Sequence, residues 1–209
     1  MNLKKLLFNK KVIMSILVFV PIFAILLVII CRHAIMPSNE DVINELKNTK
    51  YYSSKVEYVF HNSKSQFEEN TIQYYSRDIG SRIEFKDGNE RVKVYKGGEI
   101  KVEGSQDEEY ILDKDIDMIY PLAFIENILS NPQIGEIKEV KSEWGDGVYI
   151  QVNMKYDNKN KHLNKAEFYI DKNKQVPVLL KILDDTDKER IVITYKDFKK
   201  EKNLSDDLF

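Results

Sequence analysis

A period-two alternation of apolar and polar residues dominates most of the chain. Val56, Tyr58 and Phe60, for example, alternate with Lys55 and Glu57. Successive side chains of a strand point to opposite faces, so this pattern predicts a sheet with one buried and one solvent-facing side. The same spacing recurs in Ile83/Phe85, Val92/Val94, Ile100/Val102, Tyr110/Leu112, Ile137 to Trp144, Val148 to Met154, Ala166 to Ile170 and Ile191 to Tyr195. We therefore expect a mainly β (α+β) chain of about ten or eleven strands.

Glycine-containing pairs separate several of these stretches. Asp87-Gly88, Gly97-Gly98 and Gly104-Ser105 each stand between two alternating segments. Such pairs are typical of tight hairpin turns, which join antiparallel neighbours. The segment from Val176 to Leu183 is apolar on both faces, which indicates a strand covered on both sides. The sequence thus predicts an antiparallel sheet.

Two segments depart from the alternation and are expected to be helical. Ser38 and Asp41 have the spacing of a capping box, which predicts a short first helix. From Ile116 to Leu129 apolar residues occur on nearly every side. Pro121 suits the first turn of such a helix and Pro132 follows its end. A helix this apolar must be covered, and we place it against the concave face of the sheet.

The N-terminus carries a 19-residue run, Val12 to Ile30, without a charged residue. At about 1.5 Å rise per residue it extends roughly 28 Å, close to the thickness of a bilayer core. Four lysines precede the run, and only Arg32 and His33 follow it closely. Flanking basic residues resist translocation, so the sequence predicts a cytoplasmic N-terminus. We expect residues 32–209 to lie outside the cytoplasm, anchored to the cell or forespore membrane.

Cys31 is the only cysteine and stands directly after the apolar run. A bacterial lipoprotein carries its acylated cysteine at this place, so Cys31 is a candidate lipid attachment site. The bulky Ile30 before it fits the lipoprotein signal badly, and an uncleaved transmembrane helix gives the same topology. Both readings stay open. A single cysteine also excludes an internal disulfide and a Cys-based zinc site.

The charge of the exported part restricts which partners it can bind. It holds all 34 acidic residues and 28 of the 32 Lys and Arg, a net charge of −6. Nucleic-acid binding proteins carry a basic surface, so a nucleic-acid partner is not expected. We divide the chain into a basic stub with a transmembrane or lipoprotein signal segment (1–31), a spacer (32–37) and one extracytoplasmic domain (38–209).

Motifs of catalysis are missing from the sequence. There is no phosphate-binding loop, no His-Glu-x-x-His and no Gly-x-Ser-x-Gly. His33, His61 and His162 are scattered and are interpreted as solvated loop or strand-end residues. We expect no enzyme activity, no cofactor and no metal.

Two acidic stretches and two tyrosine pairs are the remaining candidate sites. Asp113 to Asp117 imitates the start of a calcium loop, but Met118 stands where the turn needs Gly, so a polar connector is favoured. Asp184 to Asp187 is interpreted as a hairpin turn. Adjacent tyrosines, Tyr51-Tyr52 and Tyr74-Tyr75, cannot both face inward in a regular strand. One ring of each pair is therefore expected to be exposed or near a groove, where partner surfaces favour Tyr.

Three stretches resemble the clostridial germination lipoprotein GerS family, which has a LolA/LolB-like fold. They are Tyr120 to Asn127, the late segment from Glu167 to Asp171 through Val176 to Val178, and Ile193 to Phe198. The resemblance implies an antiparallel half-barrel wrapped on the apolar helix. It also implies a sporulation and germination protein that binds a CwlD-type N-acetylmuramoyl-L-alanine amidase, needed for muramic-δ-lactam formation in the spore cortex peptidoglycan.

Other functions stay open beside this one. The half-barrel would also suit a lipid or lipoprotein carrier or acceptor of LolA/LolB type. The same architecture serves extracytoplasmic sensors. A homodimer formed by strand exchange is likewise left open.

Overall fold

In the computed structural model the described residues are 10–35, 37–62, 64–88, 91–104, 108–142, 145–156 and 160–209. The chain forms two compact units, Met1–Asp41 and Val42–Phe209. The first contains helix α2 (Lys10–Ile35), in which Pro21 is accommodated. The described side chains of α2, Ile13 and residues 15–28, are exposed. Among the described residues, no helix has both the length and the apolar character that a membrane crossing requires.

Helix α3 (Asn39–Lys47) begins with the capping box expected from the sequence. The backbone N–H of Ser38 donates to the carboxylate of Asp41 at 3.2 Å, and the N–H of Asp41 donates to the Ser38 hydroxyl at 3.1 Å. These reciprocal bonds satisfy amides that have no partner inside the helix. Val42 and Leu46, one turn apart, are fully buried, so the helix packs its apolar face into the core.

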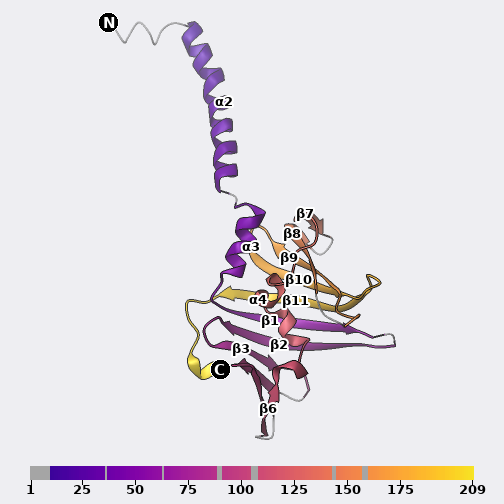
Figure 1. Ribbon diagram of the computed structural model, residues 1–209. Coiled ribbons are helices and arrows are strands. Elements are labelled where there is room, and N and C mark those ends of the chain that lie inside the picture. The colour runs from indigo at the N-terminus through magenta and orange to yellow at the C-terminus, as the bar shows by residue number, and fades with distance from the viewer. Residues whose placement is uncertain are drawn as a thin grey trace. The chain divides into compact units, whose positions relative to one another are not determined.

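Eleven strands form one antiparallel sheet in the described part of the second unit (Figure 1). They are β1 (Tyr51–His61), β2 (Gln66–Ser76), β3 (Gly80–Phe85), β4 (Arg91–Lys96), β5 (Glu99–Glu103), β6 (Glu109–Asp113), β7 (Lys138–Ser142), β8 (Gly145–Lys155), β9 (Lys165–Asp171), β10 (Val176–Leu183) and β11 (Glu189–Lys200). Their order is β6-β5-β4-β3-β2-β1-β11-β10-β9-β8-β7. The two strands at the ends of the domain sequence, β1 and β11, therefore pair at the centre, and β6 and β7 form the edges.

Burial follows the predicted alternation in most strands. Along β1 every second residue from Tyr52 to Phe60 is buried, and Ile83 and Phe85 are buried in β3. Gly97 and Gly98 close the β4–β5 hairpin with φ of 62° and 89°. Positive φ at both central residues is the type I′ geometry that matches strand twist. The antiparallel sheet and the number of strands expected from the sequence are confirmed.

A bulge in β11 lies within one of the three resembling stretches, Ile193 to Phe198. Asp197 has a φ of 52°, and the register against β1 shifts between Ser53 and Lys55. The extra residue reverses the alternation, so Tyr195 and Phe198 both face the core. The ring of Phe198 lies 5.1 Å from that of Tyr52.

The predicted single helix from Ile116 to Leu129 is wrong in its extent. The structure has three short pieces, η1 (Lys114–Ile116), η2 (Tyr120–Ala123) and α4 (Ile125–Leu129). Pro121 starts η2, as expected for a first-turn proline, but Phe124 is extended, with ψ of 131°, and breaks the helix. We call residues 114–137, which join β6 to β7, the crossing segment. A last short helix, η3 (Asp206–Leu208), follows β11.

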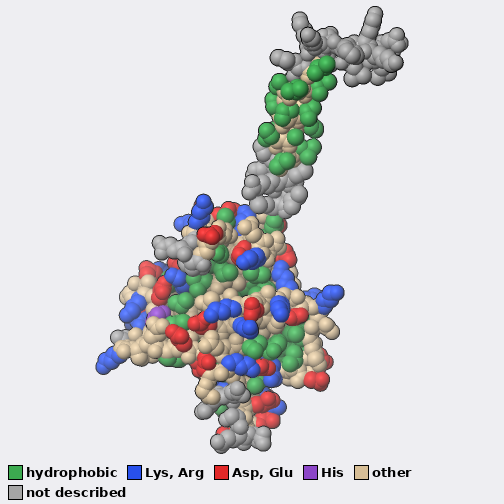
Figure 2. Space-filling view, turned by 180° about the vertical axis from the view of Figure 1, so that it is seen from behind, with side chains coloured by type: hydrophobic (Ala, Val, Ile, Leu, Met, Phe, Trp, Pro, Cys, Tyr) green, Lys and Arg blue, Asp and Glu red, His purple; other side chains and the backbone are tan. Residues whose placement is uncertain are grey.

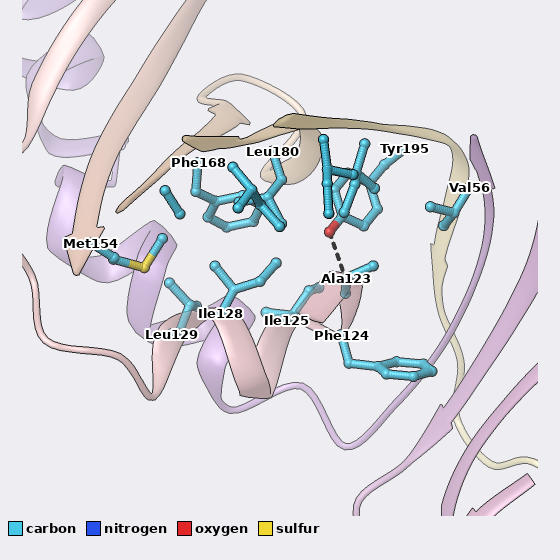
Figure 3. Close-up of a cluster of buried hydrophobic side chains, with 14 of the residues drawn as sticks. Val56, Ala123, Phe124, Ile125, Ile128, Leu129, Met154, Phe168, Leu180 and Tyr195 are labelled. Atoms are coloured by element: carbon cyan, nitrogen blue, oxygen red, sulfur yellow. Dashed lines mark hydrogen bonds between the residues drawn. The ribbon is translucent and has the colours of Figure 1, made fainter. Parts of the chain in front are cut away.

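The core lies between the crossing segment and one face of the sheet, as predicted. Figure 3 shows Ile125, Ile128 and Leu129 directed toward Phe168 and Leu180. Ile125 and Ile128 are 1% and 0% exposed. Fully burying such a side chain contributes about 1.5–3 kcal/mol. The concave face is therefore filled by the protein's own residues.

Candidate functional site

Three tyrosine hydroxyls hold the backbone of the crossing segment against the sheet. Tyr58 donates to the carbonyl of Tyr120 at 3.0 Å, and Tyr195 donates to the carbonyl of Ala123 at 2.7 Å (Figure 3). The hydroxyl of Tyr52 accepts from the N–H of Ile125 at 3.1 Å. Backbone groups outside a continuous helix need such partners when buried. The three tyrosines come from the central strands β1 and β11, so the segment is fixed to the centre of the sheet.

These three hydroxyls remain neutral over the physiological range. Burial raises the pKa of Tyr52, Tyr58 and Tyr195 far above its ordinary value. Tyr58 also accepts a bond of 2.6 Å from the amide of Gln73, which is fully buried. The crossing segment is thus held by uncharged hydrogen bonds at its centre.

Asp117 is the first charged attachment point of the crossing segment. Its Oδ2 accepts from the ammonium of Lys93 at 2.6 Å and from the hydroxyl of Tyr95 at 2.7 Å. Its Oδ1 accepts from the backbone N–H of Tyr120 at 3.3 Å. Burial, and then the Asp117 charge, raise the pKa of Tyr95. The side chains of Lys93 and Asp117 are 15% and 8% exposed, so this ion pair is largely withdrawn from water.

Glu69 supplies the second charged attachment. It accepts a hydrogen bond from the hydroxyl of Tyr120, and Arg91 reaches it at 2.9 Å. The Arg91 guanidinium lies 3.9 Å from the ring centre of Phe85, and Lys93 lies 4.7 Å from that of Tyr120. Cation–π contacts of this kind add to the ion pairs. Residues from β2, β3 and β4 therefore converge on one aromatic ring of the crossing segment.

The residues on either side of Asp117 face solvent, although Asp117 itself is held by its hydrogen bonds. Ile116 and Met118 are 66% and 53% exposed. Tyr110 and Ile111, in the preceding strand β6, are 48% and 63% exposed. Outside α2, six large apolar residues are exposed in the described part of the chain, and these are four of them. Four of the six thus lie within nine consecutive residues at the edge strand β6, which makes this stretch the candidate protein-binding region, and we call residues 110–118 the apolar edge.

The other acidic residues considered in the sequence have structural roles. Asp113 accepts from the N–H of Asp115 at 3.1 Å and caps η1. Asp184 binds the N–H and hydroxyl of Thr186, the N–H of Lys188 and the guanidinium of Arg190. The polar connector and the hairpin turn predicted from these stretches are confirmed. Among the described residues no three His, Cys, Asp or Glu side chains are grouped to hold a metal.

The tyrosine pairs divide as the alternation predicted. Tyr52 and Tyr75 are buried and their rings stack at 5.0 Å. Tyr51 donates to Asp78 at 2.9 Å near the surface, and Tyr74 lines a shallow cavity on the other face of the sheet. Their inner members belong to the core.

Two histidines that the sequence left separate meet at one cavity. His61, at the end of β1, and His162 line a space of about 240 Å³ together with Arg190 and the apolar Ile119 and Leu163. Arg190 is already paired with Asp184 at 2.7 Å. No spacing in the sequence could have joined these residues, because β1 and the loop before β9 are about 100 residues apart.

The structure does not describe the side chains of two residues named in the sequence analysis. Cys31 and His33 belong to α2, and their side chains lie outside the described residues. Lipid attachment at Cys31 stays a prediction.

On the face shown in Figure 2, Lys and Arg are interspersed with Asp and Glu, without the large basic area that nucleic-acid binding requires.

The sequence matches the model of a known family. The model of the family described as sporulation protein YdcC-like matches residues 9–209. No curated protein matches the chain. The sporulation class implied by the resemblance is confirmed by the family match.

Solved structures show the fold. An uncharacterized conserved protein from Thermus thermophilus has a TM-score of 0.53 and 15% identity, covering 81% of this chain and 90% of that one. A chain of the complex of the CwlD amidase with the GerS lipoprotein from Clostridioides difficile has a TM-score of 0.47 and 22% identity, covering 79% and 97%. A LolA superfamily protein from Nitrosomonas europaea has a TM-score of 0.44 and 9% identity, covering 83% of this chain and 97% of that one. The first likeness concerns the fold alone.

Proposed function

Because the chain belongs to the YdcC-like family of sporulation proteins, we propose that it is a non-catalytic binding protein that activates a CwlD-type cortex peptidoglycan amidase. Its membership supports the sporulation role, and the sequence resemblance to the GerS family supports the partner. The reaction served would be the formation of muramic-δ-lactam. Catalysis would belong to the amidase alone.

The observation that carries this proposal is the apolar edge. Ile116 and Met118 flank Asp117, whose three hydrogen bonds fix the local backbone. Apolar side chains presented by a fixed backbone lose little conformational freedom on binding. A rigid, exposed apolar stretch suits a protein partner better than it suits a small substrate.

We further propose that the N-terminal segment tethers the protein to a membrane. The four lysines before Val12 and the uncharged run that follows support this topology. A tether would concentrate the binding domain at the surface where cortex is assembled, which raises the effective concentration of its partner. Whether Cys31 carries a lipid does not alter this role.

A lipid carrier is less well supported. The concave face is occupied by Ala123, Ile125 and Ile128, each at most 1% exposed. The cavity beside Ile119 holds about 240 Å³. Ligand pockets usually hold about 300–1,000 Å³. An acyl chain would have to displace the crossing segment and its three tyrosine bonds.

The proposal is tested by mixing the full-length chain in detergent with a cognate CwlD-type amidase. We expect the two to co-elute in size exclusion and muramic-δ-lactam to form faster on cortex muropeptides, as measured by mass spectrometry. Ile116→Glu should weaken the complex at least about tenfold, which corresponds to about 1.4 kcal/mol. Ile134→Glu, at an apolar residue that is 40% exposed elsewhere, is the matched control. An amidase that neither co-elutes nor responds contradicts the proposal.

A further inference from the structure

The two edges of the sheet have different chemistry. In β7 the exposed residues are charged, Lys138, Glu139 and Lys141, and the one apolar residue, Val140, is half-buried. Charged edges, lysine above all, protect a sheet from adding further strands. In β6 the central residues Tyr110 and Ile111 are instead apolar and exposed. Only the β7 edge is protected in the usual way.

The outer side of β6 is available for hydrogen bonding. Its five residues, Glu109 to Asp113, pair with β5, and no other described strand lies beside it. In Figure 1, β6 is the outermost strand at the lower end of the sheet. The backbone N–H and C=O groups that point away from β5 are therefore a template for one more strand.

A shallow cavity adjoins this edge on the face opposite the crossing segment. Ile111 lines it together with Val94, Lys101 and Phe209, and it holds about 250 Å³. Lys101 is the cross-strand partner of Ile111, so both side chains lie on the same face. A strand added beside β6 would place one side chain next to Ile111, within reach of this cavity.

The charges on this face are unbalanced. Glu99 stands directly opposite Asp113, and Glu103 directly opposite Glu109. Lys101 lies between the two acid pairs and binds Glu103 at 3.1 Å and Glu109 at 3.2 Å. Like charges directly opposite each other in a sheet are destabilising. Lys96 stands opposite Glu99 on the same face, so two lysines face four acids, and basic residues from outside would relieve the remaining repulsion.

The same charges argue against a second copy of this chain. In an antiparallel self-pair centred on Ile111, Glu109 of each copy would face Asp113 of the other. That arrangement adds two acid pairs to an acidic face. The occupant must therefore be a different strand, with basic residues at its ends.

We propose that β6 receives an extended segment of a partner protein by strand addition. The segment carries Lys or Arg at its first and fifth positions, opposite Asp113 and Glu109, and an apolar residue at its third, opposite Ile111. This inference deepens the proposed function, on which it rests only for the identity of the partner as an amidase. The mode of binding follows from the edge itself.

A synthetic peptide tests the mode of binding without the amidase. The probe contains Lys-Thr-Val-Thr-Lys between short Gly-Ser spacers, and its control contains Glu-Thr-Val-Thr-Glu. Fluorescence anisotropy with the full-length chain in detergent should show the basic peptide binding at or below about 1 mM. It should bind at least about tenfold more tightly than the acidic peptide, a difference of about 1.4 kcal/mol. Hydrogen exchange should slow in residues 109–113 and not in 138–142.

Variants separate the edge from the rest of the molecule. Ile111→Lys should weaken binding of the basic peptide at least about tenfold. Val140→Lys, on the other edge, should leave the affinity for this peptide within about twofold of wild type. The double variant Glu109→Lys, Asp113→Lys should reverse the preference, so that the acidic peptide binds more tightly. Glu109, Ile111 and Asp113 are exposed and Val140 is half-buried, and circular dichroism checks that each variant folds.

Three results of the peptide experiment would overturn the inference. They are no binding of the basic peptide at about 1 mM, equal binding of both peptides, and protection of β7 in place of β6. A wild-type dimer in sedimentation that Ile111→Lys dissolves would replace the partner strand by a second copy. If the peptide binds β6 but the amidase never co-elutes, the proposed function fails and the strand addition stands. If the amidase binds the Ile111→Lys variant as tightly as wild type and the basic peptide does not bind, the strand addition fails and the proposed function stands.

Discussion

Removing the Asp117 carboxylate should destabilise the domain more than any nearby surface change. Asp117→Ala deletes the acceptor for Lys93, Tyr95 and the N–H of Tyr120. The ammonium of Lys93 would then be left in a site where its side chain is only 15% exposed. The change therefore combines lost hydrogen bonds with an uncompensated charge.

The magnitude follows from the burial of the pair. Breaking a buried ion pair from one side typically costs about 3–5 kcal/mol. Because Lys93 keeps some contact with water, we take the lower end, about 3 kcal/mol. That is a large part of the roughly 5–15 kcal/mol by which a domain is stable. For a domain of this size it corresponds to a fall in Tm of about 6–12 °C.

Urea denaturation of residues 38–209, followed by circular dichroism, measures this loss. Asp115→Ala is the matched control, because Asp115 lies two residues away and is exposed. The double variant Lys93→Met, Asp117→Ala removes both charges and should be more stable than Asp117→Ala alone, by about 1 kcal/mol or more. Amidase binding should also weaken, since Ile116 and Met118 lose their fixed backbone.

Two outcomes would refute the reasoning. One is an Asp117→Ala variant within about 0.5 kcal/mol of Asp115→Ala, which would mean that the ion pair contributes no more than a surface contact. The other is strict additivity of Lys93→Met and Asp117→Ala, which would show that the two side chains do not interact.

Three further changes have defined outcomes. Gly80 has a φ of 149°, and a Cβ there would overlap the backbone carbonyl oxygen of Tyr95. Gly80→Ala should therefore lower the free energy of unfolding, measured by urea denaturation, by at least about 2 kcal/mol. Gly88 has a φ of 65° and open space around it, so Gly88→Ala should lower it by only about 1 kcal/mol. Hydrogen bonds lower the pKa of Asp184, and the bond from the side chain of Thr186 is the largest cause. The stability that the Asp184 carboxylate contributes is therefore fully present above the ordinary Asp pKa of about 4. It is lost as the pH falls toward the lowered pKa. Melting curves should show a smaller fall in Tm below about pH 4 for Asp184→Asn than for wild type, and equal falls would contradict this. Full-length chain should sediment with membranes while residues 38–209 stay in the supernatant, and equal partitioning would remove the proposed tether.

The strands could be predicted from the sequence because their signals are local. Alternation such as Val56, Tyr58 and Phe60 is written in consecutive residues, and the turn at Gly97-Gly98 needs only its own positive φ. The capping box of Ser38 and Asp41 is equally local. Each of these features depends on residues within one turn or one strand, so periodicity and turn chemistry suffice.

The crossing segment could not be predicted because distant side chains decide its conformation. Composition alone made residues 116–129 look like one helix. Phe124 is instead extended, and Tyr52, Tyr58 and Tyr195 supply the bonds that a continuous helix would have made internally. These partners lie more than 60 residues away along the chain. Only tertiary packing brings them together.

The candidate binding surface was decided in the same way. Alternation marked Tyr110 and Leu112 as ordinary strand residues, and nothing nearby in the sequence shows that β6 lies at an edge. The pairing of β1 with β11 places those strands at the centre and leaves β6 and β7 outermost. Since that pairing joins residues about 140 positions apart, the sequence by itself determined the sheet, whereas the tertiary structure determined which strand stays open to a partner.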